Sequence, residues 1–183
     1  MNKKTWIAAA ITTFIISSPL FSMPEMVIGE AEMAPGIDLI FEGGIKDEIA
    51  PQNLYLAENE TDVHLELLAN WSDKAPRGAP IGGHVAYLDV EAMIRNEKTG
   101  AYDSVNLTPH LNISDNIHYA QNIKLPGAVS DKYTVRFVIK SPKLGVIGIH
   151  YDWRNELADV ISSGGTFTFT NLDFKEIANS KRR

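Results

Sequence analysis

The sequence predicts an all-β protein, an antiparallel β-sandwich in a single domain, and two observations lead to this prediction. From Ile37 onward, short apolar or alternating runs are separated by clusters of Gly, Pro, Asn and Asp, and no segment has helical periodicity. The chain has 183 residues, of which 44% are hydrophobic and 22% charged. This length and composition are typical of one ordinary globular domain.

Eight strands are expected, each bounded by turn residues. The clearest contains Tyr133, Val135, Phe137 and Ile139, which alternate with more polar residues, so one face should pack and the other should meet water. Residues 96–100 are expected to form a hairpin loop in which Gly100 supplies a positive φ. In chain order, the expected strands are residues 37–41, 62–71, 84–94, 102–107, 117–125, 132–140, 145–151 and 166–170.

The first 22 residues have the features of a secretory signal peptide. Lys3 and Lys4 precede an apolar stretch, which ends before turn-forming and small residues, the last of them Ser22. The apolar stretch is about half the roughly 20 residues that a membrane span needs. We therefore expect a signal peptide at residues 1–22, a β-sandwich at 23–174 and a frayed or loosely docked tail at 175–183. The short Lys-Lys signal is typical of bacteria and indicates an exported protein.

The composition argues against several classes of function. Cysteine is absent, which excludes disulfides, Cys-type zinc sites, iron–sulfur clusters, cysteine nucleophiles and blue-copper centres. The formal net charge of -6 argues against a nucleic-acid partner, because phosphates are neutralised by a basic face. No Ser lies in a Gly-x-Ser-x-Gly elbow, and the Gly pairs lack a following helix. We expect a binding protein and not an enzyme.

The five histidines are the main candidates for chemistry, although a single His on a strand is more often a half-buried polar residue than a ligand. His64 stands out because Glu66 lies two residues further on, and residues i and i+2 of a strand share one face about 6.6 Å apart. Both side chains could therefore reach one cation; the alternative is a surface ion pair with an arginine. His118 lies on the face opposite its apolar neighbours, His110 falls in an expected loop, and His150 ends an apolar strand.

Four blocks of this sequence match the pattern of a known family. Residues 62–66 (Asp-Val-His-Leu-Glu) are similar to a family segment D-I-H-L-E, and residues 95–100 (Arg-Asn-Glu-Lys-Thr-Gly) are similar to T-N-x-K-T-G. Residues 118–124 (His-Tyr-Ala-Gln-Asn-Ile-Lys) are similar to H-Y-G-A-N-I-K, and residues 148–152 match more weakly a segment ending R-H-T-D. Over about residues 28–169, the chain thus resembles the periplasmic iron-transport-associated family, small copper-binding proteins that accompany a bacterial iron permease.

The resemblance implies an immunoglobulin-like sandwich, usually a homodimer, with a metal site at the subunit interface. By position, His64, His118 and His150 take the places of the family's three copper-binding histidines, and Glu66 takes that of its nearby carboxylate. The side chain of His150 would reach the site of the partner subunit. An inner-membrane iron permease is the further partner that the resemblance implies.

The sequence departs from the family at one ligand. Where the family has a methionine ligand in a Met-Pro-Met segment, this chain has Pro109-His110-Leu111, and one extra residue before His118. Either His110 replaces the thioether, or Leu111 leaves the position empty. We include His110 with His64, Glu66, His118 and His150 in the predicted metal site.

This donor set suits copper. Three or four imidazoles with one carboxylate suit Cu(II), Zn(II) or Ni(II), among which copper binds most tightly, and imidazole in place of a thioether should favour Cu(II) over Cu(I). Iron is harder, so a transient iron site is expected to use Glu66 and other carboxylates, at a place that the sequence does not locate. Because ligating histidines must be neutral, metal affinity should decline below about pH 6.5, the pKa of free imidazole.

The favoured function is a periplasmic protein that binds copper and iron and takes part in high-affinity iron uptake. A periplasmic copper carrier that delivers copper to an exported enzyme is an alternative; such a carrier usually uses Met ligands, and only Met93 lies in an expected strand. A copper oxidase or dismutase would need a dense His-x-His motif, which is absent. An adhesin-like sandwich with incidental histidines is the remaining alternative.

Overall fold

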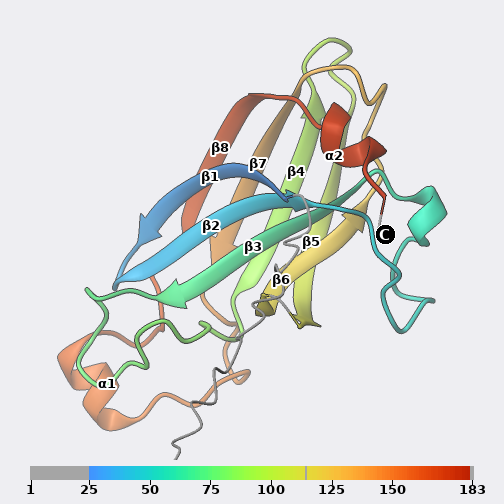
Figure 1. The fold of residues 1–183 in the computed structure, drawn as a ribbon. Coiled ribbons are helices and arrows are strands. Elements are labelled where there is room, and N and C mark those ends of the chain that lie inside the picture. Colours follow the sequence, from blue (N-terminus) through green and yellow to red (C-terminus); the bar gives the residue numbers. More distant parts are fainter. Residues whose placement is uncertain (1–24, 114, 182–183) are drawn as a thin grey trace, which may run out of the picture.

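The computed structural model describes residues 25–113 and 115–181, so the expected signal peptide at residues 1–22 lies outside the described residues. Within them, all the strand pairs are antiparallel and the helices are short (Figure 1). The strands are β1 (Glu25–Met33), β2 (Ile37–Gly44), β3 (Val63–Trp71), β4 (Asp89–Asn96), β5 (Tyr102–Asn112), β6 (Asn116–Ile123), β7 (Tyr133–Lys140) and β8 (Gly165–Leu172). The helices are a 3-10 turn (Glu58–Glu60), α1 (Tyr151–Glu156) and α2 (Lys175–Asn179).

The strands form one sheet in the order β1-β2-β3-β6-β5-β4-β7-β8, which curls until its two edges meet (Figure 1). Strand β5 connects the two halves of the sheet, because residues 102–107 pair with β4 and residues 108–112 pair with β6. At the edges, Gly29 of β1 lies against Phe169 of β8 so closely that a Cβ atom would overlap the ring. The prediction of an all-β, antiparallel, single domain is confirmed; the finer assignment as an immunoglobulin-like sandwich stays a prediction.

The core fills the inside of the curled sheet. The predicted alternation in β7 is confirmed, since Tyr133, Val135, Phe137 and Ile139 are all buried. The ring of Phe41 in β2 lies 4.6 Å from that of Phe137 and within 5.3 Å of two aromatic rings of β8. These contacts tie the two halves together, because burial of such large apolar side chains is the main favourable contribution to folding.

The expected tail is docked and not frayed. Helix α2 has two buried residues, Ile177 and Ala178, and Lys46 Nζ donates a hydrogen bond to the carbonyl oxygen of Ala178. Phe174, immediately before the helix, is fully buried and its ring lies 5.9 Å from that of Tyr133. The last described turn of the chain therefore closes one end of the core.

Four strand predictions need correction. Strand β1 is absent from the predicted strands, although Ala31 and Met33 alternate with Glu30 and Glu32 there. Residues 84–88 precede β4, and His84 forms only an isolated bridge with Asn70. Residues 145–151 are not a strand, and helix α1 begins at Tyr151. Strand β5 continues through Pro109 to Asn112, where β4 no longer pairs with it. Proline is tolerated on a strand with one open edge, because its missing N–H removes no ladder hydrogen bond.

The hairpin between β4 and β5 is as predicted. Gly100 has a φ of 77° and donates its N–H to the carbonyl oxygen of Asn96. No helix in the described part of the chain has the length and apolar character that a bilayer crossing requires.

Candidate metal centre

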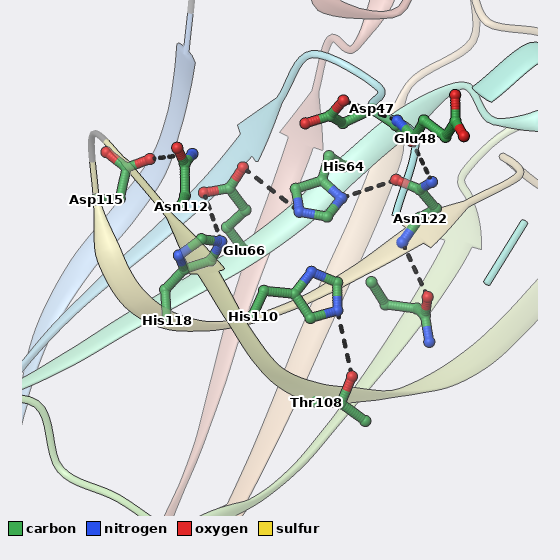
Figure 2. Close-up of polar contacts among 11 residues, drawn as sticks. Asp47, Glu48, His64, Glu66, Thr108, His110, Asn112, Asp115, His118 and Asn122 are labelled. Atoms are coloured by element: carbon green, nitrogen blue, oxygen red, sulfur yellow. Dashed lines mark hydrogen bonds and ion pairs between the residues drawn. The ribbon is translucent and has the colours of Figure 1, made fainter. Parts of the chain in front are cut away.

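Three neighbouring strands bring three imidazoles together. His64 comes from β3, while His110 of β5 and His118 of β6 are directly opposite each other in the strand register (Figure 2). One donor nitrogen from each ring lies within 4.8 Å of the other two. All three side chains are buried, with exposed fractions of 6%, 8% and 1%. The arrangement depends on strand pairing, because two of the strands are distant from β3 in the sequence.

Glu66 completes the cluster as predicted from its spacing. Its Oε1 lies 4.0 Å from Nε2 of His64 and its Oε2 lies 3.8 Å from Nε2 of His118. The carboxyl group is buried, so the alternative of a surface ion pair with an arginine is wrong. His64 and Glu66 therefore share one face of β3, and that face is turned toward a cavity of about 230 Å³.

His110 lies in the cluster, and Leu111 does not. The side chain of Leu111 is 79% exposed, whereas His110 is buried against His64, with their ring centroids 5.2 Å apart. The prediction that His110 lies in a loop is wrong, because β5 continues through it. Of the two alternatives for the departure from the family, the geometry favours His110 as the residue that stands where the thioether would be.

His150 is not near this cluster within the chain. It precedes helix α1 and lines a separate cavity of about 480 Å³, together with Trp71, His84 and Trp153. Its predicted reach to the site of a partner subunit stays a prediction.

The buried side-chain amide of Asn122 determines which ring nitrogen of His64 carries the hydrogen. The Nδ2 of Asn122 donates to the carbonyl oxygens of Asp47 and Leu56, at 2.8 and 2.9 Å, so its Oδ1 faces His64 Nδ1 at 2.8 Å. An amide oxygen can only accept, so Nδ1 of His64 carries the hydrogen. The Nε2 atom, which faces Glu66, is then the nitrogen that carries no hydrogen. Outer contacts of this kind orient metal-binding histidines and set their tautomer.

Several carboxyl groups surround the imidazoles. Burial, followed by repulsion from Asp115, Glu25 and other acidic groups, raises the pKa of Glu66 to about 8. Burial, followed by repulsion from Glu25, raises the pKa of Glu42 to about 7. Neither Glu42 nor Glu66 forms an ion pair with Lys or Arg among the described residues. A bound cation would relieve this repulsion.

Two of the imidazoles have a lowered pKa. Burial, together with the proximity of His64 and His118, lowers the pKa of His110 to about 4. Burial also lowers the pKa of His118. Neutral imidazole is the form that binds metals, so these rings are prepared as ligands at neutral pH.

The residues present fit a transition-metal ion. Three buried atoms of the cluster, Oε2 of Glu66 and the Nδ1 atoms of His110 and His118, make no hydrogen bond in the described part of the chain. Leaving buried polar atoms unpaired costs about 1–3 kcal/mol each, and such atoms in a native protein often mark a ligand site. A second group, formed by Glu66, Asp115 and His118, also has one donor atom from each residue within 4.8 Å of the others.

Sequence reasoning missed most of the supporting residues. Asn122 lies in the block at residues 118–124, but nothing in its spacing shows that it would bond His64. Asp115 lies in the β5–β6 turn and accepts a hydrogen bond from Asn112 Nδ2 at 2.8 Å. Glu42 is placed by the β2–β3 register, in which it is opposite Glu66. Asn122 and Glu42 are placed by strand registers that the sequence does not specify, and Asp115 is placed by the turn between two of those strands.

Comparison with solved structures shows which proteins share this fold. A copper-bound variant of P19 from Campylobacter jejuni has 25% identity and a TM-score of 0.69, over 81% of this chain and 96% of that one. Copper-reconstituted P19 has 25% identity and a TM-score of 0.67, over 80% and 94% of the two chains. FetP of uropathogenic Escherichia coli, as isolated after recombinant expression in the periplasm of Escherichia coli BL21(DE3), has 21% identity and a TM-score of 0.68, over 82% of this chain and 96% of that one.

Comparison with sequences gives the family. No curated protein matches this chain. The model of a family described as Fe2+ transport protein matches residues 22–175, which is most of the sequence. The chain therefore belongs to the Fe2+ transport protein family.

Proposed function

We propose that this protein binds copper and iron in the periplasm and takes part in high-affinity iron uptake with an inner-membrane iron permease. The observation that carries the proposal is the buried cluster of His64, His110 and His118, whose donor nitrogens lie within 4.8 Å of one another. Membership of the Fe2+ transport protein family supports the role in iron uptake. The copper-bound state of the similar P19 protein supports copper as the resident metal.

Copper would be held by the three imidazoles, with Glu66 beside it. Nitrogen donors of intermediate softness suit Cu(II), and copper has the highest affinity among the divalent ions of its row. Bound there, copper would supply a one-electron redox couple next to the iron. The protein residues keep the rings neutral, oriented and shielded from bulk water. No turnover of an organic substrate is proposed.

Iron, the transported ion, would be bound by carboxylates next to the copper ligands. Iron prefers harder oxygen donors than copper does. Glu66 and Asp115 provide such donors within 4.8 Å of each other, and Glu42 lies opposite Glu66 in the strand register. A transient iron site there would explain why so many buried or half-buried carboxyl groups surround one side of the imidazole cluster.

A homodimer is part of this proposal. Exposed apolar side chains flank both the metal centre and the segment that carries His150. Beside the centre these are Leu111, Ile113 and Ile117; beside His150 they are Leu144, Val146 and Tyr151. Contact between these two surfaces of different copies would cover both and would bring His150 of one chain to the site of the other.

The copper-carrier alternative has less support. A carrier that exchanges Cu(I) would use thioether ligands. The residues that line the cavity at the imidazole cluster include no methionine within the described part of the chain.

Metal titration of purified variants tests the proposal. His64→Ala, His110→Ala and His118→Ala should each lower Cu(II) affinity by about tenfold or more, and nitrogen coupling in the copper EPR spectrum should weaken. His84→Ala is the matched control, because this histidine lies in the other cavity. Growth of the bacterium on limiting iron should need the three histidines, whereas unchanged growth with a defect under copper stress would favour the carrier.

A further inference from the structure

The two ring nitrogens of His110 have different surroundings. Nε2 lies 3.3 Å from Oγ1 of Thr108, and the same Oγ1 lies 3.3 Å from the hydroxyl group of Tyr55. Nδ1 is buried and has no hydrogen-bond partner among the described residues. Figure 2 shows that this second nitrogen points toward His64, into the cluster.

The orientation of the ring is also fixed by packing. The ring of Tyr55 meets that of His110 nearly edge-on, with centroids 5.0 Å apart and an interplanar angle of 86°. A half-turn of the imidazole would exchange its nitrogens with its carbons, so it would lose the hydrogen bond to Thr108 and would point carbon into the cluster. The contact with Tyr55 therefore restrains the plane of the ring, and the hydrogen bond to Thr108 favours one of its two flipped orientations.

Hydrogen bonding then decides which nitrogen is the donor to a metal. In neutral imidazole one nitrogen carries the hydrogen and the other has the lone pair. Placing the hydrogen on Nε2 lets Thr108 accept it, whereas placing it on Nδ1 would leave a buried N–H that faces the other imidazoles without an acceptor, which is unfavourable. His64 has the opposite arrangement, because Asn122 accepts from its Nδ1.

We propose that Thr108 and Tyr55 are positioning residues that hold His110 in the Nε2–H tautomer, so that the metal centre uses Nδ1 of His110 beside Nε2 of His64. The proposal rests on the proposed function, in which the three imidazoles bind one metal ion. Thr108 acts only through His110. Its hydroxyl group also strengthens the ligand, since a hydrogen bond at the far nitrogen raises the basicity of the binding one.

The tautomers can be read without metal. In a long-range ¹H–¹⁵N correlation spectrum of the metal-free protein at neutral pH, His110 should show protonated Nε2 and bare Nδ1. His64 should show the reverse in the same spectrum, which makes it an internal standard. A predominantly Nδ1-protonated His110 in the wild-type protein would overturn the proposal, whatever the metal affinity.

Variants of Thr108 test the positioning role. Thr108→Val keeps the side-chain shape but removes the hydroxyl group; it should mix the tautomers of His110 and lower Cu(II) affinity by about tenfold. Thr108→Ser should restore both, and Tyr55→Phe should have a smaller effect than Thr108→Val. Thr168→Val is the matched control, on an exposed strand position of β8. Unchanged tautomers and affinity in Thr108→Val would contradict the proposal.

Pulsed EPR of the copper-loaded protein separates this inference from the proposed function. The remote nitrogen of His110 should give a signal that changes in Thr108→Val and returns in Thr108→Ser. If the wild-type protein binds no copper at these histidines, the proposed function fails, and the metal-free spectrum still decides the tautomer. If copper binds there and the remote nitrogen is unaffected by Thr108→Val, only the positioning role fails.

Discussion

Glu66 has a carboxyl group whose pKa lies far above its ordinary value. It is buried, lies near two imidazoles and has several acidic neighbours, and these surroundings raise its pKa to about 8. The folded metal-free protein therefore holds a proton on Glu66 that the unfolded chain releases near pH 4.5. The favourable contribution to stability is complete below the unfolded pKa and is lost as the pH rises to the folded pKa.

The metal-free variant Glu66→Gln should lose less stability between about pH 4.5 and pH 8 than the wild-type protein does. At pH 8 the variant should be more stable by roughly 2–4 kcal/mol, because it has no charge to bury. Urea unfolding at several pH values measures this difference. Equal slopes of stability against pH in the two proteins would show that Glu66 ionises normally.

The lowered pKa of His110 determines how we expect the copper centre to respond to acid. The sequence leads us to expect a decline in metal affinity below about pH 6.5, but the pKa of His110 is lowered to about 4 and that of His118 is also lowered. Protons therefore compete with the metal at lower pH than free imidazoles would allow. We expect Cu(II) affinity, measured with a chelator competitor, to fall much less between pH 6.5 and pH 5 than that of a peptide with three free imidazoles. A similar fall in both would contradict the burial argument.

Among the strands, β7 and β3 could be predicted from the sequence, whereas the full length of β5 could not. The alternation of apolar residues predicts β7 and most of β3, and the spacing of His64 and Glu66 predicts their shared face. The passage of β5 through Pro109 was missed, because proline usually ends a strand and the open edge here comes from tertiary pairing. The resemblance leads to the expectation that His64 and His118 converge, with His110 as one of two alternatives, whereas its third histidine, His150, lies in another cavity of the chain. No local pattern contains the register of β3, β6 and β5.

The close approach of β2 to β3 gives a test of the iron site. A Cβ atom on Gly44 would overlap Oε1 of Glu66, so the carboxyl group must move in Gly44→Ala. We expect Fe(II) affinity to fall by about tenfold, and Cu(II) affinity to fall less, because the imidazoles keep their places. Anaerobic titration with each metal measures the two losses. An unchanged Fe(II) affinity, or an equal loss for both metals, would count against a carboxylate site for iron.

For the whole molecule, we predict a homodimer in which His150 of one chain reaches the metal centre of the other. His150 lies in a different cavity from the imidazole cluster, so it can complete the centre only in an assembly. The curled sheet places the cluster and the His150 segment on separate parts of the surface. A two-fold symmetric contact uses each of these surfaces twice.

Mixing two defective variants tests this assembly. His118→Ala and His150→Ala should each bind copper weakly, but dimers that contain one chain of each should have one complete site. After exchange at equal concentrations, roughly a quarter of the sites should recover wild-type affinity, as expected for random pairing in a symmetric dimer. Light scattering should confirm dimers throughout. No recovery on mixing would show that His150 does not cross between chains.

The most direct test of the account is the location of copper in a crystal of the loaded protein, determined by anomalous scattering at the copper edge. We expect one strong peak within bonding distance of His64, His110 and His118, with Nδ1 of His110 facing it. A peak at His84 or on the protein surface, with the three imidazoles turned to separate partners, would contradict the central claim.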